Sequence, residues 1–504
     1  YASTGNGGGT GGRGQRIRND RGNLDYDAIY GYNLSTSGAG GNYAAEGGYV
    51  TRASMNMHNW VGMVMKYEKV FSDNLTFNVG ADLRTYYGEH FRIVENFHGL
   101  TSWQENIRLR NQNDNHQTYG SYGTYKNVIT ARDMAANPWY ATFANFNEDE
   151  KIAYSNDERI SYAGIFTQVE YTSDNFSTFF QGAVSNQSHQ RFDHYQYADQ
   201  TLIDGTSSQA TGALPGGIED GVDSEKVSNV GYNVKTGVAW DLGANGTVFL
   251  NAGYYSRQPY HDNIYLNYTN QVNPLTSNET IVGLEAGYSY SSPNFSTNVN
   301  VYRTSWADRV VSSFNVQNDV VTFTTNEGVE QLHQGIEVDF RAKPQPDVPY
   351  TLTGFVSVGD WKYVGDAVSR VTDEDQNVIS TSSEDVDGGE VGDAAQFTAG
   401  LGIDLQIAER FSMDSDLRFY DNLYADVGAV KENLKVPSYH VVDMGLSYKM
   451  YVGNDGNSLN VRLNINNVFD NVYINELRTN IAAGDGTGVL YDGIDTANQG
   501  YFGM

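Results

Sequence analysis

Apolar and polar residues alternate along most of the chain beyond residue 58. Segment 75–83 has the sequence LTFNVGADL, segment 397–405 has FTAGLGIDL and segment 459–465 has LNVRLNI, and in each of them every second residue is apolar. Side chains of a β-strand point alternately to its two faces, so this period of two predicts strands with one apolar and one polar face. The sequence therefore indicates an all-β fold, and it contains no sustained helical period.

The chain divides into about fourteen such predicted strands. Short polar turns join the two members of each pair, for example SDN at 72–74 and SPN at 292–294, whereas long loops rich in Gly, Asn, Asp and Tyr join one pair to the next. This regular alternation of turn lengths is typical of an up-and-down antiparallel β-barrel whose long loops share one rim. The predicted strands cover residues 59–72, 75–94, 158–173, 176–194, 226–242, 246–258, 279–291, 295–313, 329–343, 348–363, 392–408, 410–424, 438–452 and 456–475.

Tyrosine and tryptophan recur near the ends of the predicted strands. Aromatic side chains with one polar end favour the boundary between membrane and water, so the pattern predicts aromatic girdles around a transmembrane barrel. The alternative interpretation is that aromatic residues simply favour strands. The residues concerned are Trp60, Tyr67, Tyr86, Tyr87, Tyr171, Trp240, Tyr254, Tyr255, Tyr302, Trp306, Trp361, Tyr420 and Tyr448.

The composition narrows the possible classes of protein. The 504 residues include no cysteine, which excludes disulfide scaffolds, thiolate metal sites and cysteine nucleophiles. A formal net charge of −29 argues against nucleic acid as a partner, because phosphate binding needs a basic face. No stretch reaches the roughly 18 apolar residues of a membrane-spanning helix, but a barrel strand crosses a membrane with only about 9–11 residues of alternating character.

The segment LNVRLNINNVFDNVYINE at 459–476 resembles the C-terminal region of TonB-dependent outer-membrane receptors. That family carries an Asn-Leu-Phe-Asp-x-x-Tyr motif on its penultimate strand, and the matching residues here are Asn467, Val468, Phe469, Asp470 and Tyr473. Further stretches resemble the Bacteroidota branch of the family, namely HNWVG (58–62), LTFNVGADLRTYYGEHFR (75–92), VYRTSWADR (301–309), LHQGIEVDF (332–340), VGDAAQFTAGLG (391–402) and DNLYADV (421–427).

The resemblance implies a transmembrane antiparallel barrel of about 22 strands with a plugged lumen, of which about 14 strands are represented here. The strand that carries the motif resembles the twenty-first strand of the family. Counting back from it through the fourteen predicted strands makes segment 59–72 the eighth strand. In the family an even-numbered strand leads into a short periplasmic turn, and segment 59–72 does lead into a short turn. We expect residues 1–58 to form an extracellular loop region, residues 59–477 the strands with their loops, and residues 478–504 the last extracellular loop. The plug domain and the final strand are expected to be absent from this sequence.

The resemblance also implies a function, which is import of a scarce ligand across the outer membrane with energy supplied by TonB. The implied partners are outer-membrane lipid and lipopolysaccharide, the TonB complex through the absent N-terminal region, and a surface lipoprotein; no nucleic acid and no cofactor are expected. Ferric siderophores, glycans, peptides and vitamins all remain open as substrates. Two alternatives also remain open, a secreted soluble all-β adhesin or binding protein and a passive outer-membrane porin.

Two aromatic clusters at strand ends are the candidate ligand contacts, because rigid aromatic side chains supply large contact areas at a low entropic cost. Packing within a girdle or a loop is an equally good explanation of either cluster. The first cluster consists of Tyr86, Tyr87, His90 and Phe91, and the second consists of Tyr254, Tyr255, Tyr260 and His261.

Acidic residues suggest one weak metal site and several positions on the barrel wall. Residues Asp373, Asp375, Asn377 and Glu384 mimic a calcium loop, but Val378 stands where such a loop requires glycine, so a hairpin tip is the favoured interpretation. The nine histidines are dispersed, no catalytic motif is present, and we expect no enzyme activity. The charged residues expected to line the lumen are Asp82, Arg84, Glu337, Asp339, Arg341, Asp404, Asp414, Asp416, Arg418 and Arg462.

Overall fold

The structure is a computed structural model that describes most of the chain. The described residues are 2–3, 24–36, 49–106, 110–111, 126–130, 146–147, 150–194, 197–198, 222–265, 270, 272–273, 276–317, 320–343, 348–372, 378–426, 428–453, 456–477, 490–491, 494–495 and 500–503.

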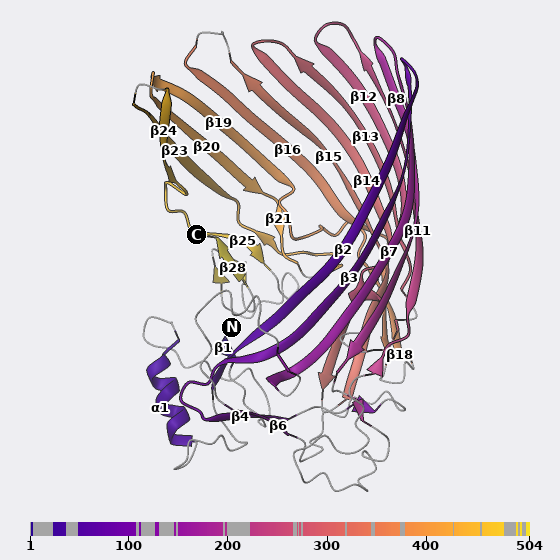
Figure 1. The fold of residues 1–504 in the computed structure, drawn as a ribbon, viewed down its shortest axis with the longest axis vertical. Helices are drawn as coiled ribbons and strands as arrows, with labels where there is room; N and C mark the ends of the chain where they lie inside the picture. The colour runs from indigo at the N-terminus through magenta and orange to yellow at the C-terminus, as the bar shows by residue number, and fades with distance from the viewer. Residues whose placement is uncertain are drawn as a thin grey trace.

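Within the described residues, fourteen long strands form one antiparallel sheet that curls into a trough (Figure 1). Each long strand pairs with the long strands before and after it in the sequence, so the chain runs up and down across the sheet, with short turns at the top of Figure 1. The predicted architecture is confirmed. The strands are β2 (Val50–Ser72), β3 (Leu75–Asn96), β7 (Lys151–Thr172), β8 (Phe176–Asp193), β11 (Val227–Asp241), β12 (Gly246–Arg257), β13 (Glu279–Ser291), β14 (Phe295–Gln317), β15 (Val320–Ala342), β16 (Tyr350–Val364), β19 (Phe397–Ala408), β20 (Phe411–Asp421), β23 (Tyr439–Val452) and β24 (Asn457–Ile465).

Smaller elements lie at the long-loop end of the sheet or within its curve (Figure 1). The β17–β18 hairpin pairs with the N-terminal part of β15, and β21 with β22, β25 with β28 and β4 with β6 form separate two-stranded ribbons. These elements are α1 (Tyr26–Thr36), α4 (His261–Ile264), β1 (Ala2–Ser3), β4 (Ser102–Asn106), β5 (Arg110–Asn111), β6 (Lys126–Thr130), β9 (Tyr197–Ala198), β10 (Val222–Asp223), β17 (Asp366–Thr372), β18 (Val378–Asp385), β21 (Leu423–Tyr424), β22 (Lys435–Val436), β25 (Tyr473–Leu477), β26 (Leu490–Tyr491), β27 (Ile494–Asp495) and β28 (Gly500–Gly503).

The N-terminal part of the chain differs from the prediction of a loop through residue 58. Strand β2 begins at Val50, and helix α1 covers Tyr26–Thr36 although the sequence carries no amphipathic helical pattern there. The extra length of β2 is held by pairing with the far end of β3, for example between Met55 and Phe91. Long-range pairing decides this boundary, and the weakly patterned local sequence does not reveal it.

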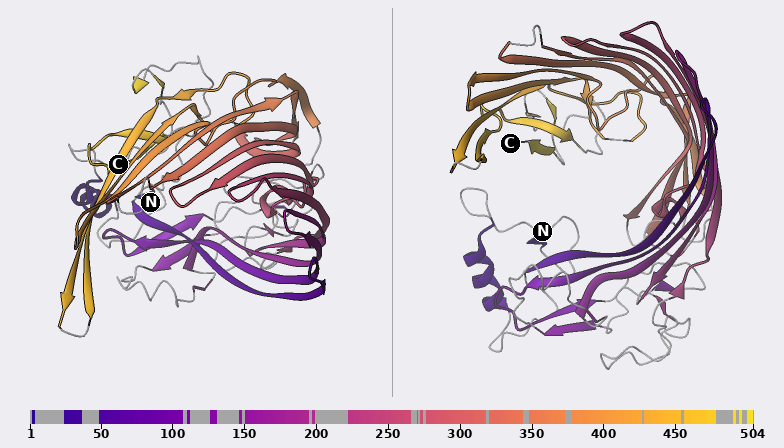
Figure 2. Two further views of the ribbon diagram at one scale, coloured as in Figure 1. Left: turned by 90° about the horizontal axis from the view of Figure 1, so that it is seen from above. Right: turned by 45° about the horizontal axis from the view of Figure 1, so that its top comes forward.

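One face of the sheet lines the trough. Tyr439 of β23 stacks on Tyr473 of β25, with ring centroids 4.3 Å apart, and β25 lies inside the curve of the sheet (Figure 2). The pairing of the strands identifies the residues of each strand that lie on this inner face, because residues directly opposite each other in neighbouring strands point to the same side of the sheet. Tyr439 pairs with Tyr420, and the same face continues through Thr398, Ser357 and Glu337.

The opposite, convex face is apolar and unusually exposed. Val301, for example, is 51% exposed although it stands between Ala286 and Ile336 in the middle of the sheet. A soluble protein rarely exposes so wide an apolar surface, whereas the outer face of a membrane barrel must do so. The half-exposed outer residues include Val61, Met63, Met65, Val238, Leu250, Leu284, Val301, Ile336, Val358, Leu401, Leu417, Val461 and Leu463.

The apolar outer band does not extend along the full length of the strands. On β8 the outward side chains are apolar at Phe180 and Val184, and then become polar at Asn186, Ser188 and Gln190. A strand needs only about 9–11 residues to cross the apolar layer of a membrane. The distal part of β8, with the parts of β7 and β3 that pair with it, therefore lies beyond the apolar band at the long-loop end.

Candidate ligand site on the concave wall

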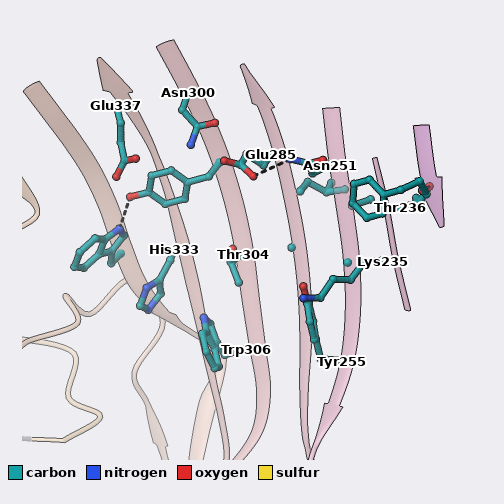
Figure 3. A pocket seen from close by; sticks show the side chains of 17 residues that line it. Lys235, Thr236, Asn251, Tyr255, Glu285, Asn300, Thr304, Trp306, His333 and Glu337 are labelled. Atoms are coloured by element: carbon teal, nitrogen blue, oxygen red, sulfur yellow. Dashed lines mark hydrogen bonds between the residues drawn. The ribbon is translucent and has the colours of Figure 1, made fainter. Parts of the chain in front are cut away.

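A hollow of about 680 Å³ lies on the inner face of β11 to β16 (Figure 3). Its walls combine aromatic rings with carboxylates, amides and one ammonium group. The lining side chains include Lys235, Asn251, Tyr255, Glu285, Asn300, Tyr302, Thr304, Trp306, His333, Glu337 and Trp361.

Four aromatic side chains contact one another along one side of the hollow. The Trp361 indole Nε1–H donates a hydrogen bond to the Tyr302 hydroxyl oxygen at 2.9 Å. The His333 ring stacks on Trp361 with centroids 5.2 Å apart and an interplanar angle of 12°, and Trp306 lies beside His333 at 6.4 Å. The wall thus presents a continuous aromatic surface of the kind that binds flat or apolar ligand groups.

Glycine makes room for these rings. A Cβ atom at Gly359 would lie 2.7 Å from the Trp361 indole nitrogen, and one at Gly335 would lie 2.7 Å from the Tyr302 hydroxyl. Both distances are shorter than atoms of these types tolerate, so the rings can lie across the backbone only where the neighbouring residue has no side chain. The glycines of the polar face are therefore part of the construction of the wall.

Carboxylates give the hollow its polarity. Glu285 accepts a hydrogen bond of 3.2 Å from the Asn251 amide, and Glu337 lies above the aromatic surface near Tyr302 (Figure 3). The Lys235 ammonium lies 5.2 Å from the centre of the Tyr255 ring, in cation–π geometry. Because its lining has two carboxylates and one ammonium group, the hollow is suited to bind hydrogen-bond donors and cationic groups.

Ion pairs cover the inner wall on the C-terminal side of this hollow. The Arg462 guanidinium lies 2.8 Å from Asp414 of β20, and Arg418 pairs with Asp443 of β23. The Arg418–Asp443 pair joins neighbouring strands, and the Arg462–Asp414 pair spans β23 across Gly445, as in a solvated barrel wall. The charged residues that the sequence placed on the polar face do lie on the inner face, where register joins them from β3 to β24.

The structure divides the predicted ligand clusters between the two faces of the sheet. Tyr255 lines the hollow, but Tyr254 points outward and stacks on Tyr232 with ring centroids 6.0 Å apart. Tyr86 points inward and bonds His58 at 2.6 Å, whereas Tyr87 points to the other face and bonds Asp157. Adjacent residues on a strand cannot share one contact surface, so neither tyrosine pair acts as a unit.

The remaining members of the predicted clusters differ in their surroundings. Phe91 is almost completely buried and packs against Phe146, while Tyr260 is exposed beneath the Arg257 guanidinium at 4.2 Å. His90 and His261 come together, because both lie next to Glu158 of β7. No pattern in the sequence indicated this last contact, since it joins three segments that are far apart along the chain.

The residues of the predicted aromatic girdle are divided between the two faces of the sheet. Some of its predicted members lie on the outer face and are exposed, namely Tyr67, Tyr171, Trp240, Tyr254 and Tyr448. The prediction is wrong for a second group, because register places these residues on the inner face. This group consists of Trp60, Tyr86, Tyr255, Tyr302, Trp306, Trp361 and Tyr420. On β14, for example, the inward-facing aromatic residues occupy the same alternate positions as the polar residues Asn298 and Asn300. This pattern in the sequence would have distinguished the two groups.

Four of the five residues of the family motif lie in a turn and not on a strand as predicted, whereas Tyr473 begins β25. Strand β24 ends at Ile465, and both Asn467 and Asp470 have positive φ angles, 49° and 52°. The Asn467 side chain accepts a hydrogen bond of 3.0 Å from the Asn471 backbone N–H and donates one of 2.9 Å to the Asn471 carbonyl oxygen. Asparagine suits this turn because it tolerates left-handed backbone and bonds it locally.

Replacing Asn467 by alanine is expected to destabilise the connection between β24 and β25 by about 1–3 kcal/mol, because two hydrogen bonds are lost and alanine strains the left-handed backbone. Hydrogen exchange at the amides of residues 467–477 measures this local stability. The Asn467→Gly variant is the matched control, since it keeps the backbone conformation and should lose less. Equal exchange rates in both variants would contradict the role of the backbone angle.

The predicted calcium site cannot be placed. Asp373, Asp375 and Asn377 lie outside the described residues, and Glu384 is exposed on β18. Among the residues that the structure describes, no group of three or more His, Asp or Glu side chains is arranged to hold a metal ion. Within the same part of the chain, no helix is both long enough and apolar enough to cross a membrane.

A curved up-and-down antiparallel sheet with an apolar outer face, a polar and aromatic inner face and short turns along one edge defines the wall of a large β-barrel. The family model for the TonB dependent receptor-like beta-barrel matches residues 2–468. The chain therefore belongs to the TonB-dependent receptor family. No curated protein sequence matches it.

Solved structures share the fold at low sequence identity. The copper transporter OprC is similar with a TM-score of 0.52 and 11% identity, over 84% of this chain and 52% of that chain. The ferric yersiniabactin uptake receptor FyuA from Yersinia pestis gives 0.51 and 10%, over 84% and 51%. The ferric-catecholate import receptor Fiu from K12 E. coli gives 0.50 and 12%, over 86% and 53%. The chain thus spans about half the length of these proteins.

Proposed function

We propose that the protein is an outer-membrane receptor that imports a scarce ligand with energy supplied through TonB. The observation that carries this proposal is the division of one sheet into an exposed apolar outer face and a polar, aromatic inner face. Membership of the TonB-dependent receptor family supports it, as does the similarity in fold to proteins described as import receptors and transporters. The exposed apolar face argues against a soluble adhesin, whose outer surface would meet water.

We propose that this wall is part of a Bacteroidota-type receptor whose barrel has about 22 strands and contains a plug. TonB would be contacted by parts of the receptor outside this sequence, and a surface lipoprotein would be a further partner at the long-loop rim. Fractionation of the full-length protein tests the localisation. Recovery from the outer membrane only with detergent is the expected result, and recovery from the aqueous phase would contradict it.

We propose that the aromatic hollow contacts the ligand on its way along the wall. The rings of Tyr302, Trp306 and Trp361 supply contact area, while Glu285 and Glu337 accept hydrogen bonds from polar groups of the ligand. The hollow lies on the inner face of the consecutively paired strands β11 to β16, so its geometry is held by the sheet and not by a loop.

Replacing Trp306 by alanine is expected to reduce ligand uptake about tenfold, because aromatic anchors in a binding hollow typically contribute about 1–2 kcal/mol or more, at about 1.4 kcal/mol per tenfold change. The assay is uptake of the labelled native ligand, identified by mass spectrometry of material that co-purifies with the full-length receptor. Trp240→Ala is the matched control, since Trp240 faces outward on β11. Equal uptake in the two variants would contradict a ligand role for the hollow.

A further inference from the structure

A short strap, residues 258–265, crosses the inner face of the sheet at the long-loop end. It starts where β12 ends, and the Gln258 side chain donates a hydrogen bond of 2.9 Å to the Ser185 hydroxyl of β8. At its other end, the Tyr265 hydroxyl oxygen lies 2.9 Å from the His189 carbonyl oxygen and 2.8 Å from that of Glu225, and its one proton can be donated to either. Ile264 is buried between these two anchors. The strap is therefore docked against β8 by a small number of named contacts.

Two buried histidines meet at the centre of this docking contact. His189 of β8 is 1% exposed and His261 of the strap is 8% exposed, and their Nδ1 atoms lie 3.3 Å apart. A hydrogen bond between two Nδ1 atoms requires that one of them carry a proton and the other carry none. If both rings were cationic, two N–H groups would face each other in a buried contact. The docked geometry thus excludes the doubly protonated pair.

The charges around the pair do not remove this restriction. Glu158 of β7 lies 3.7 Å from His261 Nε2, but it lies as close to His90 of β3, at 3.5 Å. The other ionisable groups around the pair are Arg191 of β8 and Asp262 and Tyr265 of the strap, while Asp157 of β7 acts on His90. His189 Nε2 has no hydrogen-bond partner among the described residues. One carboxylate shared between two histidines cannot neutralise a third positive charge.

The protonation preferences agree with the geometry. Burial lowers the pKa of His189 to about 4, with His261 as the second cause, and burial also lowers the pKa of His261. The hydrogen bond to Glu158 raises the pKa of His90. His90 and Glu158 both belong to the sheet, so their interaction persists whether the strap is docked or not.

We propose that the strap is an acid-released cover at the mouth of the trough. At neutral pH the His189–His261 pair is docked with at most one shared proton, and the strap covers His90 and Glu158 on the inner wall. At acidic pH both rings take up protons, the contact breaks, and the strap leaves the wall.

The direction with pH follows from linkage. A released histidine has an ordinary pKa near 6.5, while docking lowers the pKa, so the docked state binds fewer protons. The docked state is therefore most stable above a pH of about 6.5. Below that pH the equilibrium constant for docking falls about tenfold for each pH unit, until the pH reaches the pKa of the docked histidine. Two titrating rings make the dependence steeper than one.

These 504 residues contain no cysteine, so a single introduced thiol can be followed in the full-length receptor in detergent once any cysteine elsewhere has been replaced by serine. In the Ile264→Cys variant, the rate of reaction with 4,4′-dithiodipyridine is measured from pH 7.5 to 4.5 and divided by the rate for Leu242→Cys, an exposed position at a short turn. We expect the ratio to rise at least about tenfold between pH 6.5 and 5. Ile93→Cys, buried outside the strap, should stay protected at all these pH values.

Two results would overturn the proposal. One is a flat ratio across the pH range with both histidines present. The other is an unchanged rise after His189→Gln and His261→Gln are combined, because glutamine keeps hydrogen-bonding capacity without titrating. If the combined variant exposes the introduced thiol at every pH, the single His189→Gln variant takes its place and must show a smaller rise. His440→Gln serves as the control, since His440 lies on β23 and contacts Asn471, away from the strap.

Discussion

Replacing Val301 by arginine is expected to destabilise the membrane-inserted protein by about 2–4 kcal/mol, because an arginine on the lipid face near the middle of a membrane barrel must be buried in hydrocarbon. Val301 lies near the middle of the apolar part of β14, between Ala286 and Ile336, and its side chain points outward. Reversible unfolding of the full-length protein in lipid vesicles, followed with urea, measures the free-energy difference.

The adjacent residue supplies a matched control for this prediction. Asn300 points to the inner face, where it lines the aromatic hollow and pairs across the ladder with Glu337. An arginine at position 300 would meet water and a carboxylate, so a change within about 0.5 kcal/mol is expected. If both variants unfold at the same urea concentration as the parent protein, the outer face does not contact lipid and the membrane assignment fails.

Replacing Phe91 by alanine is expected to destabilise the rim where β2 meets β3 by about 3–5 kcal/mol, because the change leaves a cavity in a buried cluster. Phe91 is 1% exposed, its ring lies 5.6 Å from that of Phe146, and the Lys151 ammonium lies 4.4 Å from its centre. Hydrogen exchange at the amides of residues 50–58 and 88–96 measures the local opening free energy.

The same substitution separates two roles for Phe91. The sequence suggested a ligand contact, whereas the structure places the side chain in a packed cluster with Ile93 and Phe146. A conservative Phe91→Leu variant should lose less than about 1.5 kcal/mol and should retain full uptake. Loss of uptake in Phe91→Leu with unchanged exchange rates would show that Phe91 contacts ligand after all.

Most of the sheet was predictable because it depends on a local property. Alternation in segments such as 75–83 and 397–405 identifies a strand and its two faces without knowledge of any partner strand. The turn lengths then indicate that consecutive strands pair. The predictions failed where pairing partners decide the outcome, as at Val50–His58, which becomes strand only because β3 extends far enough to meet it.

The functional residues were less predictable, for the same physical reason. Sequence proximity grouped Tyr254 with Tyr255 and Tyr86 with Tyr87, but the pleat of the strand sends each pair to opposite faces. Conversely, Tyr302, His333 and Trp361 are far apart in sequence and adjacent in the wall. Applying the two-residue period to the aromatic residues as well as to the aliphatic ones would have recovered the inward-facing set.

The sequence by itself determined the class of fold, the order of the strands and the polarity of their faces, since these follow from local alternation and turn length. The register between strands, the depth of each aromatic ring and the meeting of His189 with His261 were decided only by the tertiary structure. Register is a cooperative property of whole strands, and a contact between segments 72 residues apart depends on how every strand between them is placed.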